Sequence, residues 1–338
     1  MSIDISEGIN EGNVEIKIIT TNTVISTLLT DERFNGKVIQ PQTNGSKYIA
    51  EHGLAMIINV KEDDHTTSIL LDTGGPRNSV IPNAESMSID FSTIDKFVLS
   101  HGHVDHYGGV MEVFPRLKKG CELIISPNAY EDNVILIPKK RGDYYTPEEL
   151  NENYRTLRKE NAFIYEVKLP TFKKALVDKY VQENDLKLIE TTEPYNLAEG
   201  VITSGEIELF DEEEVSKGFY LMKGRNNFIK NTFRDETSIY FNVKNKGLVV
   251  ITGCGHTGII NTIKHAQKIT GIDEVYAVIG GFHKEWEKDQ DIQNVVNMIK
   301  DLNPEITCGM HCTGYQFNNM MAGHPSHVYG IVGTEFHL

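Results

Sequence analysis

Three features are scarce in this sequence of 338 residues, and each scarcity excludes a class of protein. Cysteine occurs only four times, which is too few for a disulfide framework in a chain of this length. Positive charge is in deficit, and the formal net charge of −15 opposes loose association with nucleic acid or an anionic membrane. Long apolar runs are also missing, since no stretch approaches the roughly eighteen residues of a membrane-spanning helix.

The sequence begins MSIDISEGINEG, which is polar and acidic and has no signal-peptide pattern. Together with the few cysteines, this predicts a cytoplasmic protein with neither a nucleic-acid nor a membrane partner. Hydrophobic residues make up 39% of the chain and charged residues 24%, as in an ordinary soluble globular protein. The length allows one large α/β domain, or a core domain that carries an insertion.

Apolar runs that are rich in β-branched residues alternate with helical patterns in the first and last thirds of the chain. This alternation predicts a layered α/β fold. Predicted strands are Val14–Thr20, Gly53–Val60, Ser68–Leu71, Ile94–Leu99, Thr237–Val243, Gly247–Thr252, Glu274–Ile279 and Ile306–Met310. Predicted helices are Gly108–Leu117, Gly258–Thr270 and Asp291–Leu302.

The middle of the chain has a different composition, rich in Lys, Glu, Asp, Asn and Tyr. It contains a helix signal at Thr146–Lys159, where Pro147 occupies a favourable first-turn position. Strand-like patterns at Phe163–Val167 and Gly200–Thr203 argue against disorder. We therefore predict that residues 128–234 form an insertion, either a lid or a small subdomain, in a core made of residues 1–127 and 235–338.

The motif HGHVDH at residues 101–106 carries the strongest chemical signal. His101 and His103 are two residues apart, so in extended backbone their side chains leave on the same side. Asp105 and His106 follow where the chain turns into a helix, so their side chains can point in a different direction from those of His101 and His103. Neutral imidazole and carboxylate are ligands of Zn²⁺, Mn²⁺ and Fe, so we predict one or two metal ions here, zinc first and Mn or Fe as alternatives.

Further histidines follow three predicted strands in the second half. His256, His283 and His311 each lie just after the carboxyl end of a strand, where the functional residues of layered α/β folds gather. A single such histidine is more often structural, but three of them beside HxHxDH favour a shared site. We predict His256 and His283 as metal ligands and His311 as a catalytic proton donor or oxyanion partner.

Asp72 in the segment LLDTGG has two interpretations. Metal-bound imidazoles usually donate their second ring N–H to a carboxylate or a carbonyl, so Asp72 could orient a ligand histidine. An Asp before two glycines is also a common turn former. The sequence does not decide between these two roles.

These motifs resemble the metallo-β-lactamase superfamily. The likeness lies in LLDTGG, IDKFVLSHGHVDHYGGV, TSGEI, ITGCGHTGI, AVIGGFH and HCTG, and it covers roughly residues 14–127 and 200–334. The combination is most similar to the branch named after the dihydropterin–ribofuranosylaminobenzene phosphate synthase of methanopterin biosynthesis. The resemblance implies a four-layer αββα sandwich, with metal ions at one edge of its sheets.

The resemblance also implies a division of ligands between two metal ions. His101, His103 and His256 would hold one ion, and Asp105, His106 and His283 would hold the other. Where many members of the superfamily have a bridging Asp, this chain has Cys254. Three alternatives follow: a Cys254 thiolate, a carboxylate from Asp235, or tight binding of a single ion.

The expected activity is that of a metallohydrolase whose metal-bound hydroxide attacks an ester, lactone, amide or phosphate in a small soluble substrate. Asp105 would orient that nucleophile while also acting as a ligand. Two alternatives stay open, a transferase like the synthase of the branch and a non-catalytic sensor of a metal or ligand. The sequence predicts no organic cofactor.

Overall fold

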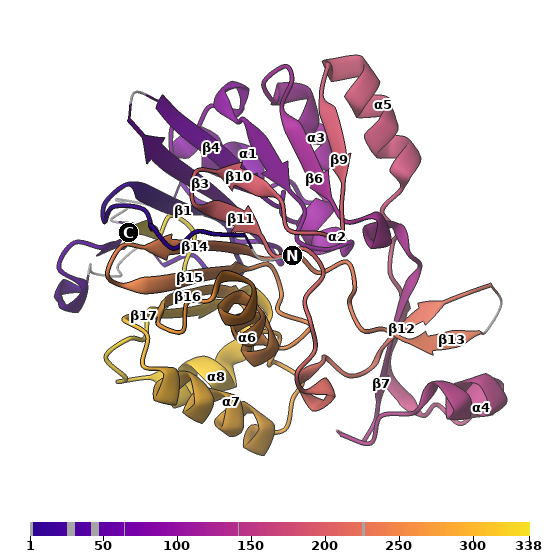
Figure 1. Ribbon diagram of the computed structural model, residues 1–338. Coiled ribbons are helices and arrows are strands. Elements are labelled where there is room, and N and C mark those ends of the chain that lie inside the picture. Colours follow the sequence, from indigo (N-terminus) through magenta and orange to yellow (C-terminus); the bar gives the residue numbers. More distant parts are fainter. Residues whose placement is uncertain (1–2, 26–30, 42–46, 64, 141, 225–226) are drawn as a thin grey trace.

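A computed structural model describes residues 3–25, 31–41, 47–63, 65–140, 142–224 and 227–338. Within these residues two β-sheets pack face to face, and helices cover the outer faces (Figure 1). The larger sheet has the strand order β2 (Val38–Ile39), β18 (Glu335–His337), β1 (Val14–Thr20), β3 (Ala55–Glu62), β4 (His65–Leu71), β5 (Lys96–Val98), β6 (Glu122–Ile125) and β9 (Lys187–Glu190). The second sheet has the order β10 (Asn196–Ala198), β11 (Val201–Thr203), β14 (Ile239–Val243), β15 (Gly247–Thr252), β16 (Val275–Gly281) and β17 (Ile306–Met310).

The helices form the two outer layers. Apolar residues of α1 (Val80–Ser86), α3 (Val110–Val113) and α5 (Lys174–Asn184) pack on the larger sheet. Apolar residues of α6 (Ile259–Thr270), α7 (Asp289–Leu302) and α8 (Gly314–Met321) pack on the second sheet. The predicted αββα sandwich is therefore confirmed. None of the helices in the described part of the chain has the length and apolarity that crossing a bilayer requires.

The period of two along each strand explains how one sequence serves two apolar layers. In β15, Val249 and Ile251 face the layer between the sheets, whereas Leu248 and Val250 face the helices. Both faces are buried, so the strand is a continuous apolar run. Because β15, β16 and β17 are parallel, their carboxyl ends lie at one edge of the second sheet. This edge positions the loops that carry the later histidines.

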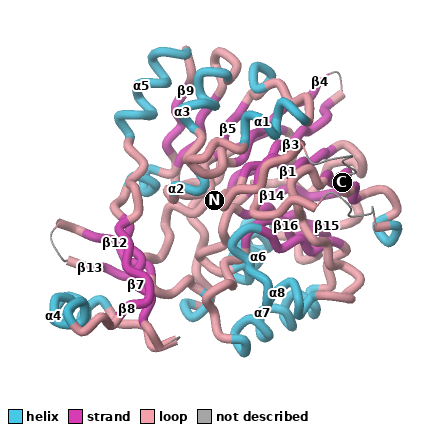
Figure 2. The backbone as a smooth tube through the Cα atoms, turned by 180° about the vertical axis from the view of Figure 1, so that it is seen from behind, coloured by secondary structure: helices cyan, strands magenta, loops and turns pink. Residues whose placement is uncertain are grey.

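A third sheet lies beside the sandwich, as the views from the front and from behind both show (Figures 1 and 2). Its strand order is β13 (Phe228–Lys230), β12 (Phe219–Met222), β7 (Asn133–Pro138) and β8 (Phe163–Lys168). Helix α4 (Pro147–Lys159) covers it through the fully buried Leu150. The helix begins at a capping box, in which Thr146 accepts from the Glu149 N–H and Glu149 accepts from the Thr146 N–H.

The polar middle of the chain does not form one body. Strands β7, β8, β12 and β13 build the third sheet, but α5, β9, β10 and β11, which also fall within residues 128–234, belong to the sandwich. Strand β9 is an edge strand with half-exposed or exposed side chains, and much of α5 faces solvent, so their composition is polar although they extend the core. The polar residues of this region therefore occur both in the separate third sheet and in solvent-facing elements of the sandwich.

Local details differ from the sequence-based elements for identifiable reasons. The predicted helix Gly108–Leu117 is shorter, because α3 changes into a 3-10 turn at Phe114–Arg116, where Pro115 removes a backbone donor. A one-turn helix, α2 (Val104–Tyr107), precedes it within the metal-binding motif. Strand β18 pairs with β1 across nearly the whole chain length, a contact that no local pattern reveals.

Candidate metal centre

The predicted site residues all lie at the edge where the carboxyl ends of the strands meet. The HGHVDH segment follows β5, while His256, His283 and His311 follow β15, β16 and β17. The imidazoles form a continuous cluster. The ring centroids are 4.9 Å apart for His101 and His256, 4.2 Å for His256 and His283, and 5.0 Å for His106 and His311.

The backbone at this edge is shaped for close approach. A Cβ added to Gly102 would lie 2.0 Å from the carbonyl oxygen of Ala129, so only glycine fits between the two motif histidines. His283 and His311 have φ values of 43° and 54°, in the left-handed region that non-glycine residues rarely adopt. Such strain costs on the order of 1–3 kcal/mol per residue and is typically found at functional sites.

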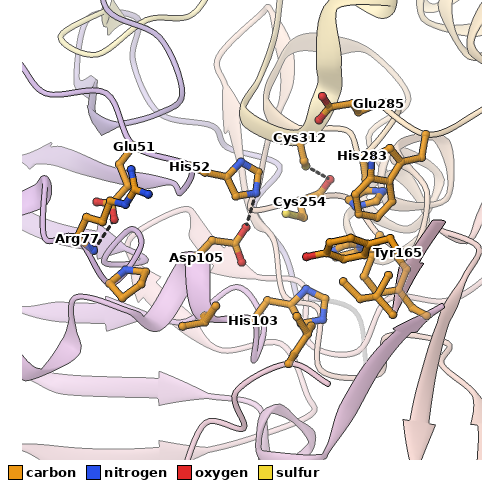
Figure 3. Close-up of a pocket in the computed structure, with 17 residues that line it drawn as sticks. Glu51, His52, Arg77, His103, Asp105, Tyr165, Cys254, His283, Glu285 and Cys312 are labelled. Carbon is orange, nitrogen blue, oxygen red and sulfur yellow. Dashed lines mark hydrogen bonds and ion pairs between the residues drawn. The ribbon is translucent and has the colours of Figure 1, made fainter. Parts of the chain in front are cut away.

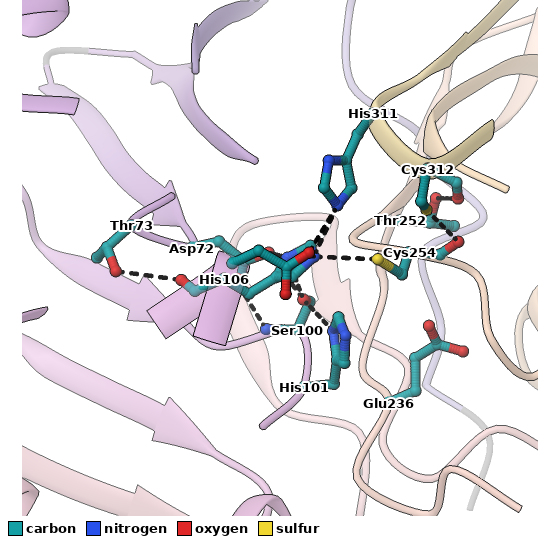
Figure 4. Close-up of polar contacts among 12 residues, drawn as sticks. Asp72, Thr73, Ser100, His101, His106, Glu236, Thr252, Cys254, His311 and Cys312 are labelled. Atoms are coloured by element: carbon teal, nitrogen blue, oxygen red, sulfur yellow. Dashed lines mark hydrogen bonds and ion pairs between the residues drawn. The ribbon is translucent and has the colours of Figure 1, made fainter. Parts of the chain in front are cut away.

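Two groups of side chains have ligand atoms close enough to share an ion. Asp105, His106, Cys254 and His311 form one group, and His101, Cys254 and His256 form the other; within each, the ligand atoms all lie within 4.8 Å of one another. Cys254 belongs to both groups, and its Sγ lies 3.0 Å from His106 Nε2 (Figure 4). The thiol thus occupies the position between the two candidate ion sites.

This grouping differs in part from the predicted division of ligands. His311, which we predicted as a catalytic residue, lies with Asp105 and His106, because its Nε2 is 3.2 Å from Asp105 Oδ2 and 3.2 Å from His106 Nε2. His283, predicted as a ligand beside those two residues, lies in neither group. His103 is also in neither group, although its ring is 4.5 Å from that of His101.

Orphaned nitrogen atoms test whether a metal fits this site. Nε2 of His101 and both ring nitrogens of His256 are buried, and none has a hydrogen-bond partner within the described residues. A buried polar atom without a partner costs about 1–3 kcal/mol, so such atoms require an explanation. Burial lowers the pKa of both histidines well below its usual value, which keeps them in the neutral form that binds metals. The donor set fits a transition-metal ion such as zinc.

Of the two roles that the sequence leaves open for Asp72, the structure shows the contact with a motif histidine. His106 Nδ1 lies 2.6 Å from Asp72 Oδ2, and both side chains are fully buried. The same carboxylate accepts hydrogen bonds from the N–H and the Oγ of Ser100, each at 2.7 Å. Because Nδ1 of His106 is engaged in this way, its Nε2 points toward Cys254 and His311.

Two consecutive acidic residues lie behind the cluster. Asp235, one of the alternatives for a ligand carboxylate, is in neither group; it accepts from the Gly102 N–H at 2.9 Å, and burial raises its pKa to about 7. Glu236 accepts from the N–H groups of His256 and Thr257 at 2.7 and 2.6 Å. Sequence reasoning missed Glu236. Two acidic residues directly before a buried apolar strand were the available signal, since buried carboxylates need partners.

A cavity of about 400 Å³ opens onto the cluster (Figure 3). Asp105, Cys254 and His256 line it, while Arg77 and His52 lie on the side of the first sheet. His52 lies outside the motifs that the sequence marks, yet its Nε2 is 3.4 Å from Asp105 Oδ2. Side chains from the third sheet and the β16 loop line the other wall: Ile135, Tyr165, Leu169, Phe219 and Trp286.

Comparison with known proteins supports the fold described above. No protein-family model matches the sequence. A solved structure described as a metal-dependent hydrolase of the β-lactamase superfamily, Tm1679, superposes with a TM-score of 0.66 at 19% identity, over 96% of this chain and 99% of the other. The chain therefore has the metallo-β-lactamase fold, and it carries an HxHxDH motif at one edge of that fold.

In sequence, the chain is similar to two proteins of Methanocaldococcus jannaschii. One is the 7,8-dihydropterin-6-methyl-4-(β-D-ribofuranosyl)-aminobenzene-5′-phosphate synthase, with 28% identity over 281 residues, 81% of this chain and 85% of the relative. The other is uncharacterised, with 28% identity over 302 residues, 87% of this chain and 99% of the relative. The likeness spans most of each relative, so it extends beyond the motif loops.

Zinc is expected to raise the melting temperature of chelator-treated protein by roughly 5 °C or more when its concentration is about a thousand times the dissociation constant. The reason is that a bound ion would give the orphaned nitrogens of His101 and His256 a partner. Differential scanning calorimetry with and without Zn²⁺ measures the shift. Magnesium, which prefers oxygen ligands, is the control and should give a much smaller one; equal shifts with both ions would contradict a nitrogen- and sulfur-rich centre.

Proposed function

We propose that this protein is a metal-dependent enzyme of the hydrolase type that acts on a small soluble substrate with an ester, lactone, amide or phosphate centre. The observation that carries the proposal is the buried cluster of imidazole, carboxylate and thiol groups that lines an open cavity. A purely structural zinc site has four protein ligands and is closed, whereas a catalytic site keeps a position open to substrate. The cavity supports the catalytic alternative over a non-catalytic sensor.

The ligands proposed for the metal follow the two groups of side chains. His101, His256 and Cys254 would hold one ion, and Asp105, His106 and His311 would hold a second, with Cys254 within reach of both groups. Thiolate and imidazole favour zinc over manganese or magnesium. A bound ion of this kind lowers the pKa of a coordinated water and polarises the electrophilic centre of a substrate.

The chain's own side chains provide the remaining chemistry. The Asp105 carboxylate reaches the cavity and lies within 3.4 Å of ring nitrogens of both His311 and His52, so it can orient a nucleophile in front of the cluster. Phe219 and Trp286 stack with centroids 6.0 Å apart and form an apolar wall that limits the access of water. Arg77, on the opposite side, offers a guanidinium for an anionic group of the substrate.

The proposal is tested by loading the purified protein with zinc and measuring hydrolysis of phosphodiesters, lactones and thioesters. We expect at least one class to be hydrolysed in a zinc-dependent manner, with loss of activity after chelation and recovery on adding zinc back. The negative net charge favours small molecules over nucleic acid as substrates. Binding of zinc without turnover of any class would favour the sensor or the transferase instead.

A second candidate is a transferase that joins a dihydropterin to a ribofuranosyl-aminobenzene phosphate, the product named for one relative. Two observations favour it: the 28% identity to that synthase, and a cavity that combines flat aromatic side chains with a guanidinium. Aromatic side chains stack on planar rings, and arginine binds phosphate in a bidentate manner. Formation of the joined product from the aminobenzene ribotide and a dihydropterin whose 6-methyl group carries a leaving group, with release of that group, would distinguish this activity from hydrolysis.

Replacing Arg77 with alanine is expected to raise KM for an anionic substrate by about 10- to 100-fold and to leave kcat nearly unchanged. The guanidinium would contribute charge-assisted hydrogen bonds of about 1.5–3 kcal/mol that are the same in the ground and transition states. Steady-state kinetics on R77A and on R77K, which keeps the charge, measure the effect. If kcat falls instead of KM rising, Arg77 acts on the reaction itself and does not hold the substrate.

A further inference from the structure

One short segment touches both halves of the metal centre. It runs from Phe233 to Thr237, between the third sheet and β14. The N–H of Thr237 donates to the carbonyl oxygen of Ser100 at 2.7 Å, at the start of the HGHVDH loop. The ring of Phe233 stacks on that of His256, with centroids 4.3 Å apart and an angle of 5° between the planes. The segment therefore contacts ligand loops from both sheets of the sandwich.

Asp235 and Glu236 make the specific polar contacts in this segment. Asp235 Oδ2 accepts from the backbone N–H of Gly102, the residue between His101 and His103. Glu236 uses one oxygen for the N–H of His256, and its other oxygen accepts from the N–H and the Oγ of Thr257 at 2.6 and 2.7 Å. Both residues are buried, with 7% and 1% of their surface exposed.

We propose that Asp235 and Glu236 are positioning residues that hold the HGHVDH loop and the GCGHTG loop at a fixed separation, so that His101 and His256 can bind the same ion. The two loops come from different sheets, and a carboxylate that fixes backbone N–H groups also fixes the side chain on that backbone. Glu236 uses both of its carboxylate oxygens in these contacts and Asp235 uses its Oδ2, so we assign both residues to holding the loops and not to binding the ion. This inference rests on the proposed metal centre.

The test measures the dissociation constant of Zn²⁺ by competition with a chromophoric chelator. In E236Q the side-chain NH₂ faces backbone N–H donors, so the loop loses an acceptor and the zinc affinity is expected to fall about 10- to 100-fold. D235N is expected to act similarly through the other loop. The visible absorption of the Co²⁺-loaded protein should change in both variants, because the ligand geometry around the ion changes.

Glu51 supplies a matched control. It is a buried carboxylate that accepts from two backbone N–H groups, those of Arg77 and Ser79, at 2.6 and 3.0 Å, in a loop without a proposed ligand. E51Q should keep the zinc dissociation constant within about twofold of the parent protein. If E51Q weakens zinc binding as much as E236Q does, the effect is general loosening of the fold and the proposal is overturned.

A double-mutant cycle separates positioning from stability. If Glu236 acts through His256, then E236Q should cause no further loss of zinc affinity in the H256A background. A full additional loss there would overturn the proposal. Should E236Q fail to fold, as judged from the melting temperature of the metal-free protein, D235N in the H101A background provides the same comparison. Unchanged zinc affinity in H256A alone would reject the metal centre itself, whereas weak binding in H256A with normal binding in E236Q would reject only the positioning role.

Discussion

The His101→Ala variant is expected to bind zinc at least about 100-fold more weakly than the parent protein and to lose its metal-dependent activity in proportion. Zinc held by about four protein ligands gains roughly 10–16 kcal/mol, so one ligand contributes about 3 kcal/mol. The buried Nε2 of His101 has no other partner within the described residues. Isothermal titration calorimetry or chelator competition gives the affinity, and turnover at limiting zinc gives the activity.

The fold should tolerate this change better than the metal centre does. His101 Nδ1 lies 2.9 Å from Ser100 Oγ, but that hydroxyl keeps its hydrogen bond to Asp72 when the imidazole is removed. His65→Ala is the matched control, because the His65 side chain is 69% exposed and its Nε2 lies 2.8 Å from the Glu62 carboxylate, away from the centre. Zinc binding in H101A that equals binding in H65A would remove His101 from the centre and contradict the proposed function.

Cobalt-loaded protein is expected to show a strong thiolate-to-cobalt charge-transfer band in the near ultraviolet, and Cys254→Ser is expected to abolish it. Cys254 lies in both groups of candidate ligands, with its Sγ 3.0 Å from His106 Nε2. Because Cys254 is a candidate ligand in both groups, its loss should weaken the binding of metal ions by about 100-fold or more. Absorption spectroscopy during a Co²⁺ titration measures the band and the stoichiometry together.

Cys312 is the control for this experiment. It also lines the cavity, and its Sγ lies 3.4 Å from the carbonyl oxygen of Cys254, but it belongs to neither group of ligand atoms. C312S should therefore keep the charge-transfer band. A band that survives in C254S and disappears in C312S would assign the thiolate to Cys312. If the parent protein shows no such band, the bound Co²⁺ has only nitrogen and oxygen ligands.

The metal-binding motif could be predicted because its information is local. HGHVDH places four ligand-type side chains within six residues, and the preceding apolar run predicts a buried strand that holds them at a sheet edge. Their positions beside one another in the structure follow from that spacing. The alternation of apolar runs and helical patterns similarly predicts the layered fold, because a strand that is buried on both faces must be a continuous apolar run.

The assignment of the later histidines depends on long-range packing. His256, His283 and His311 occupy equivalent places after three parallel strands, so their sequence contexts are alike. Which of them reaches Asp105 and His106 depends on how the second sheet lies against the first. The structure brings His311 to that group and leaves His283 beside His256. No pattern along the chain distinguishes these two arrangements.

By itself, therefore, the sequence determined the fold class, the HxHxDH segment and the set of strand-end residues from which a centre can be built. Only the tertiary structure decided that Cys254 lies between two groups of ligands and that β9 to β11 belong to the core sheets. It also decided that Asp235 and Glu236 hold loops from opposite sheets. The physical reason is that side-chain periodicity fixes which face of an element is buried, whereas contacts between distant loops depend on the relative placement of whole sheets.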